Sequence, residues 1–266
     1  MNTTVVIVSF KSEHLIIKNI ENFDYNTPII IIDNSNNVNL KKTIEGKYNN
    51  VKVLLNNNCG FGQAANLGAS LATTKYIFFC SPDNYVEQRA IYNLENICKD
   101  FNDKFGLLVL TDKKKIIKEI KKIYNPCGIS CFFLEKKTFF DLKGFDENFF
   151  LYYEDTDLIK RFLDKKQNIY QVPINYSNYF GSHNKLFSTT IEINRNWHYM
   201  WSKFYYRRKH FGYLYALIST LPYFLRSMLK VIININKIEE KNKYLARLSG
   251  LYNSYILKKA WYRPKI

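Results

Sequence analysis

Three acidic side chains stand close together directly after an aromatic run. Glu154, Asp155 and Asp157 follow Phe149-Phe150-Leu151-Tyr152-Tyr153, where a helix is expected to begin. The helix dipole and the free N–H groups of a first turn stabilise acids there, so helix capping on a solvated face explains the cluster. A carboxylate beside aromatic side chains can also be tuned as a general base. The interpretation as a general base requires a partner site elsewhere in the chain.

Asp83 supplies a candidate partner site. It follows the apolar run Tyr76–Cys80 in the sequence Ser81-Pro82-Asp83-Asn84. A carboxylate at a strand end can bind Mg²⁺ or Mn²⁺, which prefer oxygen ligands shared with a phosphate. An aspartate after proline is also a common turn residue. His183, in a polar Gly-Ser-His-Asn loop, is a structural histidine or a further ligand of a metal or phosphate.

Two glycines, Gly60 and Gly62, precede an expected helix within Asn56–Gly68. Glycine lets a backbone approach a ligand closely, and a helix N-terminus attracts phosphate. The spacing differs from G-x-G-x-x-G and follows the third apolar run of the chain, which disfavours a dinucleotide-binding fold. A Gly-x-Gly turn without a ligand is the alternative interpretation.

Short apolar runs alternate with helical stretches in the first half of the chain, which predicts βαβ units and a mostly parallel sheet with helices on both faces. The carboxyl ends of such strands line the functional crevice. The expected strands are 5–9, 29–32, 51–55, 76–80, 106–110, 127–134 and 169–172. The expected helices are about 12–22, one before 51, one from about 62, 87–105, one from the acidic cluster to about 166, 189–209, 213–235 and 237–260, with an exposed hairpin or helix edge at 113–122.

Composition and charge limit the class of protein. Apolar residues make up 47% of the 266 residues and charged residues 23%, which excludes disordered, collagen-like and coiled-coil chains. The net charge of +16 divides into +3 for residues 1–194 and +13 for residues 195–266. We therefore expect an α/β domain over residues 1–188 and a basic, aromatic-rich helical region over 189–266. Such a region attracts nucleic-acid phosphates or an anionic membrane, and charge alone does not distinguish them.

Three further features bear on location. The start, Met1–Ser9, has no basic segment or cleavage site typical of a signal peptide and is expected to form a strand. The uncharged run Phe211–Leu225 has 15 residues, fewer than the roughly 20 that span a bilayer, so lying on a membrane is favoured over crossing it. The five cysteines lack C-x-x-C spacing and are expected to be reduced thiols of a cytosolic protein: Cys59, Cys80, Cys98, Cys127 and Cys131.

The ordered motifs resemble glycosyltransferase family 2, most closely its bacterial rhamnosyltransferase-like branch. They are Asp33-Asn-Ser, the segment Asn58–Asn66, Ser81-Pro-Asp83 and the segment Gly144–Arg161 with its aromatic-aromatic-Glu-Asp-x-Asp core. The resemblance covers roughly residues 3–210. It implies a GT-A fold, an inverting mechanism, and transfer of rhamnose or another hexose or deoxyhexose from a dTDP- or UDP-linked donor.

The resemblance also implies roles for particular residues. Asp33 would read the nucleotide base, and Asp155 would act as the catalytic base with Glu154 as its neighbour. The metal, Mg²⁺ or Mn²⁺, would be held by Asp83 and His183, although only one carboxylate stands in the metal motif. The implied donor-binding residues are Ser9, Phe10, Asp33, Asn58, Gly60, Gly62, Asn66, Ser81 and Asp83.

The basic region fits an acceptor that is polyprenyl-diphosphate- or lipid-linked, such as a growing surface glycan, on the cytoplasmic face of a bacterial membrane. The expected surface anchors are Trp197, Trp201, Arg207, Arg208 and Lys209. The alternatives are a helical bundle with an aromatic core, or a homodimer interface. The competing functions are a sugar nucleotidyltransferase, a membrane-docked inactive scaffold, and a nucleic-acid-binding protein; we expect no nucleic-acid partner.

Overall fold

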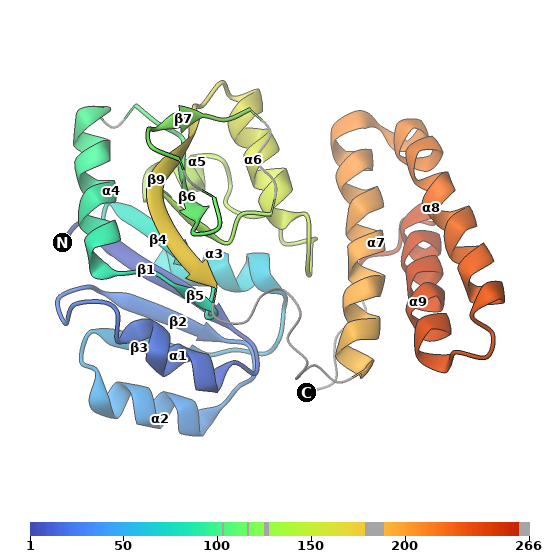
Figure 1. The fold of residues 1–266 in the computed structure, drawn as a ribbon, viewed down its shortest axis with the longest axis horizontal. Coiled ribbons are helices and arrows are strands. Elements are labelled where there is room, and N and C mark those ends of the chain that lie inside the picture. The colour runs from blue at the N-terminus through green and yellow to red at the C-terminus, as the bar shows by residue number, and fades with distance from the viewer. Residues whose placement is uncertain (103, 116, 125–127, 179–188, 261–266) are drawn as a thin grey trace. The chain divides into compact units, whose positions relative to one another are not determined.

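The chain forms two compact units. The computed structural model describes residues 1–102, 104–115, 117–124, 128–178 and 189–260 (Figure 1). Residues 1–145 and 158–183 make up the α/β unit, and residues 146–157 and 184–266 make up the helical unit. The segment 146–157, which carries the acidic cluster, therefore belongs to the helical unit, although it precedes the last strand in the sequence.

A mixed sheet organises the α/β unit. Its strands lie in the order β3-β2-β1-β4-β8-β6-β9-β5, with β7 paired to β9. The first four strands are parallel, whereas β8 runs antiparallel to both β4 and β6. The strand bounds are β1 Thr3–Ser9, β2 Ile29–Asp33, β3 Val51–Leu55, β4 Tyr76–Cys80, β5 Asn84–Tyr85, β6 Leu107–Asp112, β7 Lys121–Lys122, β8 Cys131–Glu135 and β9 Ile169–Asn178.

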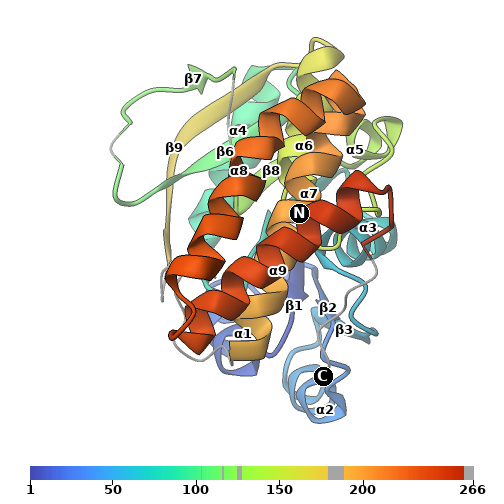
Figure 2. The ribbon, with the colours of Figure 1, turned by 90° about the vertical axis from the view of Figure 1, so that its right-hand side faces the viewer.

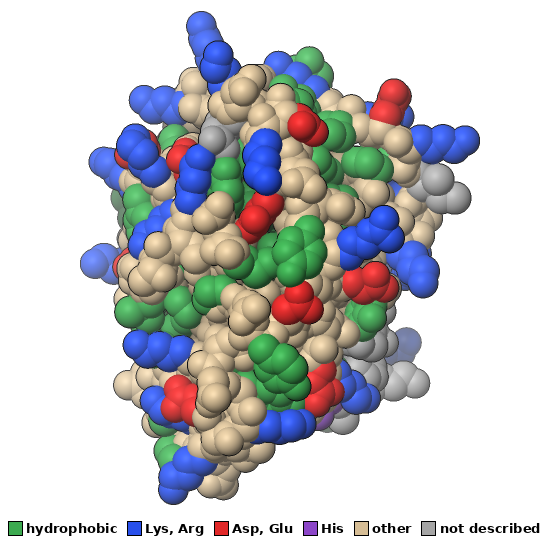
Figure 3. Space-filling model, turned by 90° about the vertical axis from the view of Figure 1, so that its left-hand side faces the viewer, with side chains coloured by type: hydrophobic (Ala, Val, Ile, Leu, Met, Phe, Trp, Pro, Cys, Tyr) green, Lys and Arg blue, Asp and Glu red, His purple; other side chains and the backbone are tan. Residues whose placement is uncertain are grey.

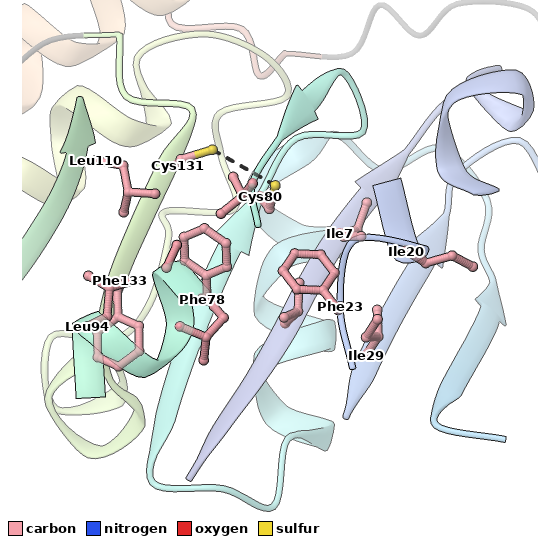
Figure 4. Close-up of a cluster of buried hydrophobic side chains, with 14 of the residues drawn as sticks. Ile7, Ile20, Phe23, Ile29, Phe78, Cys80, Leu94, Leu110, Cys131 and Phe133 are labelled. Atoms are coloured by element: carbon pink, nitrogen blue, oxygen red, sulfur yellow. Dashed lines mark hydrogen bonds between the residues drawn. The ribbon is translucent and has the colours of Figure 1, made fainter. Parts of the chain in front are cut away.

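Helices cover both faces of this sheet, because successive strand residues point to opposite faces. Val5 and Ile7 of β1 contribute to one core cluster, together with residues of α1, α2 and α4, and Val6 contributes to the other, together with residues of α3, α5 and α6. Figure 4 shows the first cluster, to which Phe78 of β4 and Phe133 of β8, paired on neighbouring strands, both contribute. The helix bounds are α1 Glu13–Ile20, α2 Val38–Lys47, α3 Phe61–Leu71, α4 Gln88–Asp100, α5 Lys136–Asp141 and α6 Glu154–Asp164. The predicted α/β architecture with helices on both faces is confirmed.

Strand β9 is longer than the sequence predicts. It continues through Pro173 to Asn178, whereas the expected strand ends at Val172. Pairing with β6 shifts register between Val109 and Thr111, which marks a bulge or irregularity. Proline is tolerated at such irregular positions because a ladder hydrogen bond is already missing there. The added length gives β5, directly after Asp83, a strand to pair with.

Surface charge on the α/β unit is mixed. On the face in Figure 3, Lys and Arg side chains are interspersed with Asp and Glu, as the near-neutral balance of residues 1–194 leads one to expect. Three of the four described cysteines are buried and form no disulfide with another described residue: Cys80, Cys98 and Cys131. Burial raises the pKa of the Cys131 thiol well above its ordinary value, so this thiol is protonated at neutral pH. Cys127 lies outside the described residues.

Three helices make up most of the helical unit, as predicted: α7 Thr189–Phe211, α8 Tyr213–Ile233 and α9 Ile238–Tyr255 (Figure 2). Helix α9 approaches α7 closely at Gly250, where an added Cβ would stand 2.4 Å from the Trp197 carbonyl oxygen. Within the described part of the chain, α8 is the one helix long and apolar enough to cross a membrane by length and composition.

The two tryptophans are not surface anchors, which corrects the prediction from sequence. Trp197 and Trp201 are each only 3% exposed and pack with Phe150, Ala246 and Ala260. Their indole N–H groups donate to Ser249 Oγ at 3.1 Å and to the Lys258 carbonyl at 2.9 Å. A tryptophan that is buried and hydrogen-bonded in this way stabilises the core of the unit and is not available to a membrane.

The predicted cationic anchors also have partners within the unit. Lys209 Nζ forms ion pairs with Asp146 at 2.7 Å and Asp157 at 2.6 Å, so its charge is neutralised locally, which corrects its assignment as a membrane-facing cation. Arg207 donates to the Ser219 carbonyl at 2.7 Å. Arg208 lies over the Tyr205 ring, 5.2 Å from its centroid.

Candidate active site

Three parallel strands end side by side in polar residues. The Asn34 N–H donates to the Ser9 carbonyl at 2.8 Å, and the Asn56 N–H donates to the Asp33 carbonyl at 2.9 Å. Asp33 is fully buried, and its carboxylate oxygens accept from the backbone N–H groups of Ser35 at 3.2 Å and Asn37 at 2.7 Å. These bonds fix the carboxylate, and its assignment to the nucleotide base stays a prediction.

Asn34 joins these strand ends to the turn before α3. Its side-chain amide donates to the Gly60 carbonyl at 3.2 Å and accepts from Asn56 Nδ2 at 2.8 Å. Asn58 Oδ1 accepts from the Gly60 N–H at 3.3 Å, and Gly60 has a φ of +97°, a value that side-chain-bearing residues rarely adopt. The predicted donor-binding residues Asn58 and Gly60 thus shape one turn, and Gly62 is buried in the first turn of α3.

The strand β1 ends in a buried hydroxyl with an unmet hydrogen bond. Ser9 Oγ has no hydrogen-bond partner within the described residues, and Ser9 is fully buried. A buried polar atom of this kind usually requires a partner such as water or a ligand. Phe10, the next residue, is half-buried, and Lys11 Nζ lies 5.7 Å from its ring centroid. This end of β1 therefore offers a hydroxyl and an aromatic face.

A buried asparagine holds the turn that carries Asp83. Asn19 Nδ2 on α1 lies within hydrogen-bond distance of the carbonyls of Ser81 and Pro82 at 3.3 Å and of Asn84 at 2.6 Å. Asp83 itself is half-buried. Asn19 was not singled out from the sequence, but a lone amide on the buried Leu15-Ile16-Ile20 face of α1 is a usable signal for a fixed polar partner.

The donor set around Asp83 fits a weakly held metal. Among the described residues, no group of three or more His, Cys, Asp or Glu side chains stands ready to hold an ion. Mg²⁺ is nevertheless often bound through one or two carboxylates together with substrate phosphates, and the single carboxylate of Asp83 is compatible with such a site. His183 lies outside the described residues.

Asn66 has a structural use that the sequence did not indicate. Its side-chain amide donates to the Phe145 carbonyl at 2.9 Å and accepts from the Phe145 N–H at 2.8 Å. Arg161 supports the same turn by donating to the carbonyls of Leu142 and Gly144. Asn66 therefore holds the turn at 144–145, and its assignment to the donor stays a prediction.

In the helical unit, one face of α7 holds the segment 146–157. Arg195 Nε donates to the Tyr152 hydroxyl at 2.7 Å, and Ser202 Oγ donates to the Leu151 carbonyl at 2.9 Å. The other contacts along this face follow helical spacing, and the α7 residues that make contacts are Arg195, His198, Tyr199, Ser202, Tyr205, Tyr206, Lys209 and His210. The helix therefore serves as a scaffold for the acidic segment.

The backbone immediately before the acids is strained. Tyr152 and Tyr153 both have a φ of +68°, in the left-handed region that bulky residues rarely adopt. Such a conformation persists only where surrounding contacts enforce it, and here the tyrosine rings pack on Tyr199 and Tyr206 of α7. Strain of this kind next to two carboxyl groups is typical of functional sites.

The two neighbouring acids occupy different environments. Glu154 is buried, and its Oε2 has no hydrogen-bond partner within the described residues. Burial, followed by the nearby charge of Asp155, raises the pKa of Glu154 to about 8, so this carboxyl is protonated at neutral pH. Asp155 is half-buried, and its Oδ1 accepts from the Thr156 N–H at 2.7 Å. Asp155 is therefore the better candidate for a base.

The raised pKa predicts how Glu154→Gln affects stability. In the unfolded chain the Glu154 carboxyl ionises above about pH 4.5, whereas in the folded protein it stays protonated up to about pH 8. Ionisation therefore favours the unfolded chain, and the folded protein loses stability as the pH rises from 4.5 towards 8. The variant should match the wild type near pH 4 and be more stable by about 2–4 kcal/mol at pH 8. Urea unfolding at both pH values measures this difference. A variant that is no more stable than the wild type at pH 8 would contradict the assignment of Glu154 as neutral.

Solved structures define the class of fold. The chain is similar to the structure titled S. aureus TarS 1-349, with a TM-score of 0.57 and 12% identity over 94% of this chain and 91% of that chain. It is also similar to GalNAc-T7 with UDP, GalNAc and Mn²⁺, with a TM-score of 0.54 and 15% identity over 70% of this chain and 45% of that chain. No curated protein matches the chain. The fold is that of the GT-A glycosyltransferases.

The family follows from the sequence. A family model described as glycosyl transferase family 2 matches residues 4–166, more than half of the chain. The chain belongs to this family. Membership implies a nucleotide-sugar donor and a glycan acceptor. The matched range includes the strand ends, the Asp83 turn and the acidic pair.

Proposed function

We propose that the chain is an inverting glycosyltransferase that moves one hexose or deoxyhexose, such as rhamnose, from a dTDP- or UDP-linked donor to a hydroxyl of a glycan. The acceptor oxygen attacks the anomeric carbon, the bond from that carbon to the diphosphate breaks, and the nucleoside diphosphate leaves. Asp155 takes the proton of the acceptor hydroxyl. The observation that carries the proposal is the pair Glu154 and Asp155, one buried and neutral and the other half-buried.

At the donor, the proposal assigns Asp83 to a divalent ion shared with the diphosphate. When bound, Mg²⁺ or Mn²⁺ stabilises the negative charge that develops on the leaving diphosphate. Asn19 positions the Asp83 turn through the carbonyls that it binds. Ser9 and Phe10 offer a hydroxyl and a ring for the nucleotide, beside the fixed carboxylate of Asp33.

The acceptor side of the proposal is a lipid-linked or surface glycan, handled at the cytoplasmic face of a bacterial membrane. Two features support it: the net charge of +13 over residues 195–266 and the apolar helix α8 of the same unit. A polyprenyl-diphosphate-linked acceptor remains at the bilayer surface, so an enzyme that docks there would find its substrate in two dimensions.

Replacing Asp83 with alanine tests the donor site. The variant should bind the nucleotide-sugar donor about tenfold or more weakly in Mg²⁺ or Mn²⁺ and should lose most of its dependence on the metal, since a charged ligand contact is removed. Isothermal titration calorimetry with and without the metal measures both effects. Asp100→Ala, which removes an exposed acid from α4, is the matched control. Unchanged metal dependence in Asp83→Ala would remove Asp83 from the site.

A further inference from the structure

Helix α8 presents large apolar side chains to solvent. Its small residues Ala216, Thr220 and Ser227 are buried in the unit. Leu214 and Ile218 are each 71% exposed. The other large apolar residues of α8 that are at least 45% exposed are Tyr215, Leu221, Leu225, Met228, Leu229, Ile232 and Ile233. The small side chains of α8 therefore pack within the unit, and its large apolar side chains are exposed to solvent.

The exposed residues form one continuous stripe. Leu214, Ile218, Leu221, Leu225 and Ile232 recur at intervals of three, four or seven residues, which places them within an arc of about 60° on a helix of 3.6 residues per turn. We call these five residues the apolar stripe. The 21 residues of α8 extend it over about 30 Å. A continuous exposed apolar surface of this length indicates an interaction site.

Basic side chains stand on the same helix, to one side of the stripe. At 100° per residue, Arg226 lies about 80° and Lys230 about 120° beyond the edge set by Ile218, with the exposed Leu229 and Ile233 in between, and α8 has no acidic residue. Neither cation forms an ion pair within the described part of the chain. Long basic side chains beside an apolar face reach anionic headgroups while the apolar residues enter the acyl region.

We propose that the apolar stripe docks the protein on an anionic bilayer, with α8 lying in the plane of the interface. A second copy of the chain is a poorer partner for this face, because it would bring Arg226 and Lys230 close to like charges. The proposal deepens the membrane location given under the proposed function by naming its surface. It moves that surface from the α7 tryptophans to α8, and it does not depend on catalysis.

Crossing the membrane would require α8 to leave its unit. Thr220 Oγ1 contacts the Tyr255 hydroxyl of α9 at 3.1 Å, and the Ser219 carbonyl accepts from Arg207 of α7 at 2.7 Å. Phe224 packs against Tyr255 with ring centroids 5.8 Å apart. These contacts hold the side of α8 opposite the stripe, so one face is available to lipid while the other stays within the unit.

Vesicle binding tests the proposal directly. The wild-type protein should cosediment with vesicles containing phosphatidylglycerol, and I218E/L225E should bind them about 100-fold more weakly, because two apolar residues are replaced by acids. R226Q/K230Q should bind these vesicles roughly 10- to 30-fold more weakly and should show little change on pure phosphatidylcholine. The matched control Y25E/V38E adds the same charge at exposed apolar positions of the α/β unit and should bind as the wild type does.

Two outcomes would overturn the proposal, and a third bears on the proposed function alone. Circular dichroism and donor binding establish that each variant is folded, independently of vesicle binding and of glycosyl transfer. Equal vesicle binding by I218E/L225E and Y25E/V38E would overturn the proposal. A wild-type dimer in sedimentation velocity that I218E/L225E converts to a monomer, without any vesicle binding by the wild type, would assign the stripe to a second copy. Failure of transfer with intact vesicle binding would count against the proposed function alone.

Discussion

Replacing Asp155 with asparagine is expected to lower kcat by about 10²–10⁴-fold while leaving the fold and donor binding intact. The amide keeps the shape of the carboxylate but cannot take the proton of the acceptor hydroxyl, and a positioned base contributes about this much to a rate. Thr156 can still donate to the remaining side-chain oxygen, so the local structure should survive. Transfer kinetics at saturating donor and acceptor measure the loss.

The control for this variant is Asp164→Asn, at the other end of α6. Asp164 is 51% exposed and pairs with Lys160 on the same helix. Asp164→Asn removes one negative charge from the same helix, so any general electrostatic effect should appear in both Asp164→Asn and Asp155→Asn. Near-wild-type turnover in Asp155→Asn would show that another group takes the proton. Glu154→Gln with unchanged kcat is expected alongside it, because the wild-type Glu154 is already neutral at pH 7.

Replacing Lys209 with methionine is expected to destabilise the helical unit by about 3–5 kcal/mol, because it leaves buried carboxylates without their cation. Asp157 is fully buried, with His210 Nε2 at 2.8 Å as a further partner, and Tyr205 donates to Asp146 at 3.0 Å. Burial alone would raise the pKa of Asp146, but hydrogen bonds from Lys209 and Asn148 outweigh it, and the pKa lies below its ordinary value. Urea unfolding at pH 7 measures the loss.

The sign of the pH dependence offers a second readout for Lys209. A carboxyl whose pKa is lowered by folding stabilises the folded state at pH values above its ordinary pKa. This stabilisation is lost as the pH falls through the folded pKa. The difference in stability between the wild type and Lys209→Met should therefore become smaller as the pH is lowered below about 4. Lys137→Met, which breaks an exposed pair with Asp141, should leave the unfolding midpoint unchanged. Equal midpoints for the two variants would contradict a structural role for Lys209.

Much of the fold was predictable because local patterns and tertiary structure agree. The strands 51–55 and 76–80 match their expected bounds, since apolar runs of this length suit a sheet covered on both faces. The short helix Lys136–Asp141 and strand Asn84–Tyr85 were not expected. Neither is long enough to show a period, and both depend on neighbours that are distant in the sequence, such as β9 for the strand.

The site was predictable in its acids but not in what holds them. The motif around Glu154 and Asp155 is visible in the sequence, whereas their supports on α7 lie about 40 to 55 residues later. The tryptophans show the limit most clearly. Composition marks Trp197 and Trp201 as amphipathic side chains but does not tell which helix face packs on a neighbour. The uncharged run Phe211–Leu225 was the better signal for an exposed apolar surface, because α7 and α9 accept its small residues and not its large ones.

Whether this chain uses a nucleotide sugar is tested by donor binding. Purified protein would be heated with dTDP- and UDP-sugars and with free nucleotides, each with and without Mn²⁺ or Mg²⁺. A ligand that binds the native state at about 100 times its Kd adds about 2.7 kcal/mol, which raises the Tm by roughly 5 °C or more. Such a rise is expected with one class of nucleotide sugar and should be larger with the metal present. No rise with any nucleotide sugar, from protein shown to be folded, would contradict this expectation.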